Sequence, residues 1–144
     1  MGRLEIAGMD DLLKKLDNLS DRGKVEEIAK KAVAAAQPLN EAAMRSAIAS
    51  VEYGPYATGS VSGSVTSTEA KINSYGAYAV ARPTGRDAKG VRNGEKAAYL
   101  QYGSPRDGPK KLAARPWRQR AVNSAEGPCR TRMEEVLKAE MGLE

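Results

Sequence analysis

The sequence contains no histidine and no phenylalanine, and it has one cysteine and one tryptophan in 144 residues. Without histidine it lacks the usual general base, the usual activator of a serine or cysteine nucleophile and the commonest metal ligand. The single cysteine, Cys129, excludes an internal disulfide and any zinc or iron–sulfur site built from cysteines. We therefore expect a protein that is not an enzyme and that holds no metal and no cofactor.

Large apolar side chains are also scarce. Alanine supplies 23 of the 59 hydrophobic residues, and leucine, valine and isoleucine together supply another 23. So few large side chains are typical of disordered chains, but those also carry a high net charge, and here the net charge is only +5. We therefore expect a single domain over residues 1–144, with a thin core that completes its packing against partner subunits.

Long apolar runs are missing as well, since no stretch approaches the roughly 20 residues that span a membrane. No secretory signal opens the chain. Gly2 follows Met1, but Ile6 stands where a myristoylation motif requires serine or threonine. We expect a soluble protein made inside the cell, without a membrane partner.

The N-terminal third has a helical pattern. A leucine stripe after Asp10 predicts a first helix, and Ser20–Gly23 is expected to end it and to cap the next one. From Lys24 to Ala47, apolar residues recur at steps of three and four, which predicts a long alanine-rich helix. Pro38 lies inside this helix and is expected to kink it. The residues of the leucine stripe are Leu12, Leu13, Leu16 and Leu19.

Alternating patterns predict short strands in three places, namely Leu4 to Gly8, Ser60 to Thr68 and Ala77 to Arg82. Residues 97–102 fit either a strand or one helical turn. Pro116 is well placed as the first residue of a C-terminal helix, which a Gly-Pro pair at 127–128 is expected to interrupt. The order of these elements predicts an α+β domain in which N-terminal helices pack on a small antiparallel sheet, with a helix at the C-terminus.

Positive charge is concentrated in one part of the chain. Residues 82–120 carry 11 lysines and arginines against three acidic residues, a net charge of +8, whereas the rest of the chain sums to −3. Most of these charges lie in two long loops, expected at 83–96 and 104–114. Such loops fit contacts with the phosphates of nucleic acid. They also fit exposure to solvent or an acidic surface on a neighbouring subunit, which we prefer because no known nucleic-acid-binding motif accompanies them.

Other candidate sites are weaker. The serine-rich run at 60–64 lacks the lysine of a phosphate-binding loop. Cys129 precedes Arg130, whose charge would lower the pKa of the thiol. With no base available, however, we interpret this cysteine as incidental. Trp117 is expected to anchor either the core or a subunit contact.

Five blocks follow one another along the chain. They are an opening segment over 6–16, an alanine-rich helix with a proline at 36–39, a Thr-Gly-Ser-Val start at 58–65, an Ala-Tyr-Leu-Gln-Tyr-Gly-Ser stretch at 98–104 and an Ala-Arg-Pro-Trp stretch at 114–122. Together they resemble the head–tail joining or tail completion (neck) proteins of long-tailed bacteriophages. The sequence departs from that pattern at Gln101, which replaces an acidic residue, and at Arg118, which replaces an apolar one.

The resemblance implies a structural role. Proteins of this family form rings, commonly of six subunits, between the capsid connector and the tail, and they leave a channel for DNA. It therefore implies a homo-oligomeric ring, expected as a hexamer, located in the virion at the head–tail junction after assembly in the host cytoplasm. The implied partners are the connector or adaptor and the tail tube or terminator proteins. A basic nucleic-acid-binding accessory protein is the alternative function.

The candidate contact residues are basic and aromatic residues of the positively charged region. We expect the two long loops to become ordered against neighbouring subunits or adjacent rings, with basic residues facing acidic rims or DNA. The candidates are Arg86, Lys89, Arg92, Tyr99, Tyr102, Arg106, Lys110, Lys111, Arg115 and Trp117.

Overall fold

Two N-terminal helices organise the computed structural model, which describes residues 9–54, 57–104 and 112–142. Helix α1 covers Met9–Ser20, and α2 covers Arg22–Val51. Asp21 separates them and caps α2, because its side chain accepts a hydrogen bond from the backbone N–H of Lys24. The predicted helices and the break between them are confirmed. Helix α2 runs unbroken through Pro38, and the kink expected there stays a prediction.

A β-hairpin follows α2 and a single helical turn, α3 (Ser60–Gly63). Its outer ladder pairs Val65 with Pro83, and its inner ladder pairs Lys71 with Tyr78. The pairing shifts by one residue between the ladders, so three residues (68–70) face two (79–80), as in a β-bulge. The four strands are β1 (Val65–Ser67), β2 (Lys71–Asn73), β3 (Gly76–Tyr78) and β4 (Ala81–Pro83).

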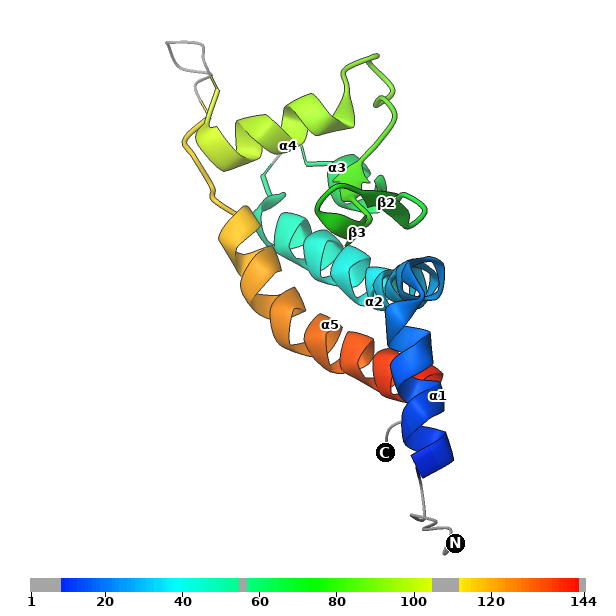
Figure 1. The fold of residues 1–144 in the computed structure, drawn as a ribbon. Helices are drawn as coiled ribbons and strands as arrows, with labels where there is room; N and C mark the ends of the chain where they lie inside the picture. The colour runs from blue at the N-terminus through cyan, green and yellow to red at the C-terminus, as the bar shows by residue number, and fades with distance from the viewer. Residues whose placement is uncertain (1–8, 55–56, 105–111, 143–144) are drawn as a thin grey trace, which may run out of the picture.

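Two further helices complete the fold, α4 (Asn93–Tyr102) and α5 (Arg118–Met141). Helix α5 runs beside α2, and in the view of Figure 1 α2 lies between α5 and the hairpin. Helix α4 lies at one end of the molecule, and α1 lies at the other. The architecture is α+β, as the sequence predicts. Among the described residues, no helix is both long and apolar enough to cross a bilayer.

The core lies where the C-terminal half of α2 meets the hairpin, α4 and the start of α5. Ile48 and Val65 are completely buried, and Met44 and Leu112 pack against the cluster from its edge. Four of the ten core residues are alanines, so this core buries little large apolar surface. Its members are Ala47, Ile48, Val51, Val61, Val65, Ala81, Ala97, Leu100, Trp117 and Ala121.

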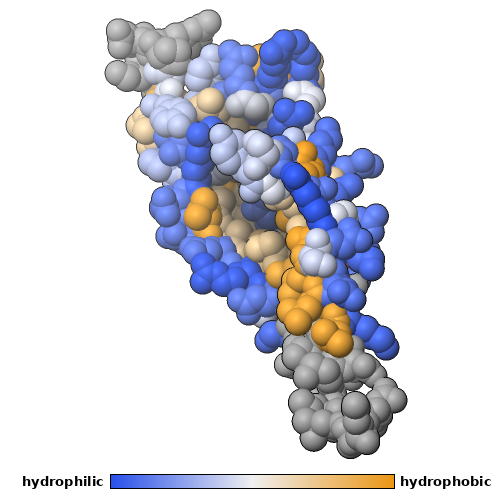
Figure 2. Space-filling model, viewed as in Figure 1, coloured by the Kyte–Doolittle hydropathy of each residue, from blue (hydrophilic) through white to orange (hydrophobic). Residues whose placement is uncertain are grey.

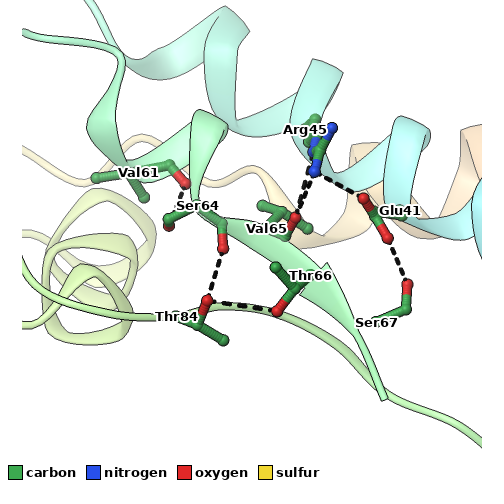
Figure 3. A network of polar contacts seen from close by, with 8 residues as sticks. All are labelled: Glu41, Arg45, Val61, Ser64, Val65, Thr66, Ser67 and Thr84. Carbon is green, nitrogen blue, oxygen red and sulfur yellow. Dashed lines mark hydrogen bonds and ion pairs between the residues drawn. The ribbon is translucent and has the colours of Figure 1, made fainter. Parts of the chain in front are cut away.

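Polar contacts fasten the hairpin to α2, as Figure 3 shows. The guanidinium of Arg45 donates to the carbonyl of Val65 at 2.7 Å and forms an ion pair with Glu41 at 2.7 Å. The carboxylate of Glu41 in turn accepts a hydrogen bond of 2.7 Å from the hydroxyl of Ser67. Two turns of α2 thereby fix the position of β1.

Several expected elements differ from those observed. The strand expected at Leu4 to Gly8 lies outside the described residues. Of the strand expected over Ser60 to Thr68, the first part is helix α3 and only 65–67 is strand. Ala77 to Arg82 is not one strand, because the bulge divides it between β3 and β4. Residues 97–102 belong to α4, whose first turn also occupies 93–96 and shortens the first basic loop.

The interruption expected at Gly127 and Pro128 is wrong, because α5 is continuous from Arg118 to Met141. Proline lacks the N–H that would bond to the carbonyl four residues earlier, here that of Ser124. Ser124, Gly127 and Pro128 are all exposed, so water can satisfy the freed carbonyl. Packing along α2 keeps the helix together on its other side. The helix also starts two residues later than Pro116.

Candidate functional site

An open cleft of about 1040 Å³ lies where α2, β4, the loop before α4 and the start of α5 meet. Four arginines line it, and Glu95 is the one acidic residue among the described residues of its lining. Figure 2 shows a hollow in this face, with apolar atoms at its bottom and hydrophilic side chains around it. We call this the arginine cleft. Its arginines are Arg82, Arg86, Arg92 and Arg118, and its apolar lining includes Met44, Ala81, Ala97, Ala121 and Val122.

Local structure explains why the arginines are exposed here. In β4, the pleat buries Ala81 and exposes Arg82. Arg86 and Arg92 face each other across an isolated antiparallel bridge, and the backbone N–H of Asn93 donates to the carbonyl of Gly85. These contacts close the loop at its base and bring both arginines to the cleft.

Asp87 organises this loop from inside. Its carboxylate accepts hydrogen bonds from the backbone N–H groups of Lys89 and Val91 and forms an ion pair with Lys96 of α4. The Lys96 ammonium and these N–H groups hold the pKa of Asp87 below its ordinary value, although desolvation acts in the opposite direction. The loop is therefore built around a carboxylate that stays ionised at neutral pH.

The fourth arginine is positioned by a contact between α4 and α5. The side-chain oxygen of Gln101 accepts hydrogen bonds from the backbone N–H groups of Trp117 and Arg118, at 2.9 and 3.0 Å. Gln101 thereby caps the start of α5, where backbone donors lack helical partners. A carboxylate at this position would accept the same hydrogen bonds. The guanidinium of Arg118 donates to the hydroxyl of Tyr102 at 2.9 Å and so extends toward α4.

Two of the candidate contact residues hold the fold together instead. Arg115 donates to the carbonyls of Val51 and Tyr53, at 3.0 and 2.9 Å, and stacks 3.8 Å from the centre of the Tyr53 ring. It thus supplies hydrogen-bond donors to backbone carbonyls at and just beyond the C-terminal end of α2. Trp117 is 4% exposed, and its indole N–H donates to the carbonyl of Ala97. Trp117 is therefore placed in the core, where little of it can reach a partner.

A glycine closes the second basic loop. Gly103 has a φ of +86°, and a Cβ there would lie 2.9 Å from the carbonyl oxygen of Leu112. Next to it, the N–H of Ser104 donates to the same carbonyl, and that of Arg115 donates to Leu100. The chain therefore returns alongside itself at 103–104 and 112–115, and any side chain at position 103 would separate the two segments.

The other candidates are dispersed. Arg86 and Arg92 meet in the arginine cleft, whereas Lys89 is exposed at the tip of the loop and does not line the cleft. Tyr99 donates from its hydroxyl to Glu95, and Tyr102 is 67% exposed. Arg106, Lys110 and Lys111 lie outside the described residues.

Arg82 and Arg118 are the functional candidates that sequence reasoning did not select. Both belong to the basic region at 82–120, but no local pattern in the sequence marks them as neighbours of Arg86 and Arg92. The alternation of Ala81 and Arg82 in a strand is a weak signal for Arg82. The position of Arg118 depends on the contact of α4 with α5, and no pattern in the sequence around Arg118 predicts that contact.

A second, more apolar depression lies between α2 and α5 and adjoins the arginine cleft. It has a volume of about 270 Å³ and shares Asn40 and Val122 with the cleft. We call it the α2–α5 groove. Its lining residues are Val33, Ala36, Gln37, Asn40, Val122, Ala125, Glu126, Cys129 and Met133.

Cys129, in this groove, is not an activated thiol. Burial raises its pKa, and its Sγ lies 3.5 Å from the carbonyl oxygen of Ala36, to which it donates. The lowering expected from Arg130 is wrong, because that side chain forms an ion pair with Glu126 at 2.8 Å. Among the described residues, no group of three or more acidic or cysteine side chains is placed to hold a metal ion.

Comparison of this chain with protein-family models, with curated proteins and with solved structures finds no match.

Proposed function

We propose that this chain is a structural subunit of a ring at the head–tail junction of a long-tailed bacteriophage. In that role it completes the end of the tail and joins it to the capsid connector around a channel for DNA. The ring is a homo-oligomer, proposed as a hexamer, and performs no catalysis. The five blocks that resemble neck proteins support this function.

One structural observation carries the proposal. The core is small, yet large apolar side chains lie on the surface of α1 and of the part of α2 that precedes the core, up to Leu39. Leu13, Leu16 and Leu19 are each about half exposed, and Val25 and Leu39 are 37% and 39% exposed. A subunit that buries this surface on assembly gains stability that it lacks alone. When the two subunits use different surfaces, such a contact closes into a ring if the rotation between them permits.

The direct test combines the mass of the free protein with its location in the virion. We expect a ring-sized species, or assembly that occurs only when the connector is added, and we expect the protein at the neck of the particle. A protein that stays monomeric with connectors present, and is absent from purified virions, would contradict the proposal.

A loop variant makes the test specific. Replacing residues 86–92 by two glycines removes two cleft arginines, while Gly85 and Asn93 are already joined by a backbone hydrogen bond. We expect a folded monomer that fails to join heads to tails. Arg86→Gln with Arg92→Gln is the matched control for charge alone. Normal virion assembly by the loop variant would exclude a role for this loop.

The arginine cleft favours a second candidate function, binding of nucleic acid through its phosphates. That function predicts a monomeric protein whose affinity for duplex DNA falls steeply with added salt. Replacing Arg82 and Arg92 by glutamine would then reduce the salt dependence. Neither result is expected of a ring subunit whose arginines face protein.

A further inference from the structure

The four arginines of the arginine cleft form no ion pair with any described residue. Elsewhere in the described part of the chain, four other arginines each pair with a glutamate. The acidic residue of the cleft lining, Glu95, accepts a hydrogen bond from the hydroxyl of Tyr99. The positive charge of the cleft is therefore available to an anionic partner. The ion-paired arginines are Arg22, Arg45, Arg130 and Arg132.

Two of the cleft arginines are already held in position. Arg86 donates to the carbonyl of Gly90 at 2.7 Å, and Arg118 donates to the hydroxyl of Tyr102 at 2.9 Å. A guanidinium has five N–H donors, so each of these contacts leaves donors free. Among the described residues, none accepts a hydrogen bond from the side chain of Arg82 or Arg92. The cleft thus offers planar donor groups that can bind a carboxylate or a phosphate through paired hydrogen bonds.

The floor of the cleft distinguishes between these two anions. Figure 2 shows apolar atoms at its bottom, where Met44 is half-buried and Val122 is 55% exposed. Duplex DNA is bound by helices or loops that enter its grooves, so a concave surface reaches its phosphates and leaves this floor uncovered. The bases of single strands stack on accessible aromatic rings. Trp117, the one aromatic residue among the described lining residues, is 4% exposed.

We propose that the arginine cleft binds an acidic peptide segment of a partner protein, in which carboxylates flank a large aliphatic side chain. The carboxylates pair with Arg82 and Arg92, and the aliphatic side chain packs on Met44 and Val122. At about 1040 Å³ the cleft is at the upper end of the usual range for ligand sites, so it has room for a short segment. The inference rests on the proposed function and deepens it, because it names the chemistry of the protein surface that the ring subunit joins.

Binding of short peptides to the whole protein tests this site. The probe is a fluorescently labelled peptide, Glu-Glu-Leu-Leu-Glu-Glu, which we call the leucine peptide. In one comparison peptide glutamine replaces every glutamate, and in the other serine replaces both leucines. At physiological ionic strength we expect each comparison peptide to bind at least about tenfold more weakly in fluorescence anisotropy, since one lacks the carboxylates and the other lacks the apolar contact.

A pair of matched charge variants locates the binding. Arg82→Gln with Arg92→Gln should weaken binding of the leucine peptide at least about tenfold, because both proposed carboxylate partners are removed. Arg22→Gln with Arg132→Gln is the control, since it removes the same charge from ion-paired arginines outside the cleft. The control should change the affinity little, and equal losses in the two double variants would contradict binding in the cleft.

A variant of the floor separates a peptide from nucleic acid. Val122→Ser should weaken binding of the leucine peptide about fivefold, because it removes an apolar contact. It should leave the affinity for an oligothymidylate with four phosphates unchanged, since that affinity depends on charge. Val80→Ser is the matched control, because Val80 is 44% exposed and is not among the residues that line the cleft.

Three further outcomes would overturn the inference. They are a leucine peptide that does not bind even at millimolar concentration, equal affinities for the leucine and serine peptides, and tighter binding of the oligothymidylate that is lost with Arg82 and Arg92. The last result would assign the cleft to nucleic acid. None of them changes the mass of the free protein or its place in the virion, which test the ring function separately. Conversely, a protein that binds the leucine peptide in the cleft but is absent from virions would retain the site and lose the ring function.

Discussion

The two ends of this molecule treat the same kinds of side chain differently. At the packed end, which we define as residues 44–54, 57–104 and 112–122, Ile48 and Val65 are completely buried, although Val80 and Val122 remain 44% and 55% exposed at its surface. At the open end, residues 9–31 and 130–142, Leu13, Leu16 and Leu19 remain about half exposed. Among the described residues of the open end, one ion pair links segments distant in sequence. It joins Lys31 to Glu140, and both side chains are exposed.

The packed end also carries the polar contacts that link distant segments. Arg45, Gln101 and Arg115 each satisfy backbone groups far away in the sequence. Such contacts stabilise one arrangement, because a buried backbone group left without a partner is costly. The long-range hydrogen bonds that select one fold therefore lie at the packed end. At the open end, by contrast, the leucine side chains of α1 stay about half exposed to solvent.

The largest expected effect is the loss of the central aromatic side chain. Trp117→Ala should lower the free energy of unfolding by about 3–5 kcal/mol, because it leaves a cavity in a core that has few large side chains. Trp117→Phe is the control for the hydrogen bond to Ala97 and should cost less. Denaturant unfolding measures both. A loss below about 1 kcal/mol would mean that the packed end does not carry the stability.

The next effect concerns the end of α2. Arg115→Met should cost about 1.5–3 kcal/mol, since it removes charge-assisted hydrogen bonds to two carbonyls and leaves them without a partner. Arg120→Met is the matched control, because Arg120 donates to an exposed serine hydroxyl, that of Ser50. Equal losses in the two variants would contradict a special role for Arg115.

A smaller effect is expected at the start of α5. Gln101→Leu should cost about 1 kcal/mol, the usual value of a helix N-cap. Gln101→Glu should retain the cap and add a favourable interaction with the helix dipole. Thermal unfolding of the two variants distinguishes them, and identical melting temperatures would show that the cap contributes nothing.

The loop around Asp87 should respond to acid. Its pKa is lowered in the folded protein, so the stabilisation is complete above the unfolded value of 3.8 and is lost as pH falls through the folded pKa. Asp87→Asn should therefore destabilise the loop at pH 7 and match the wild type well below pH 4. Amide exchange at Lys89 and Val91 measures this locally. A difference that persists undiminished at low pH would exclude the carboxylate charge as its cause.

The smallest effect is expected at the open end. Replacing Leu13, Leu16 and Leu19 together by serine should change the free energy of unfolding of the monomer by less than about 0.5 kcal/mol per site, since these side chains are half exposed. The same variant should lose self-association. A large destabilisation of the monomer would erase the contrast between the two ends.

Much of the helical structure could be predicted because it depends on local patterns. The spacing of apolar residues from Lys24 onward, and the capping residue Asp21, specify α2 without any distant contact. The strands were predicted only coarsely, since each has three residues and the bulge at 68–70 has no clear signature in the sequence. Residues 97–102 fit two structures until the packing of Ala97 and Leu100 on the core selects the helix.

In the arginine cleft, too, some features could be predicted from the sequence and others depend on tertiary contacts. The concentration of positive charge over residues 82–120 is visible in the sequence, and it contains all four arginines of the cleft. Which four meet depends on the pleat of β4, the closed base of the loop and the cap that Gln101 places on α5. These are contacts between segments remote in sequence, so composition and spacing alone select Lys89 as readily as Arg118.

By itself, the sequence determined the α+β class, the long alanine-rich helix and the scarcity of large apolar side chains, because these follow from composition and local periodicity. Only the tertiary structure decided that Trp117 and Arg115 support the core, that α5 continues through Pro128 and that Leu13, Leu16 and Leu19 stay about half exposed. The physical reason is that burial and hydrogen-bond satisfaction depend on neighbours far along the chain, which local pattern cannot specify.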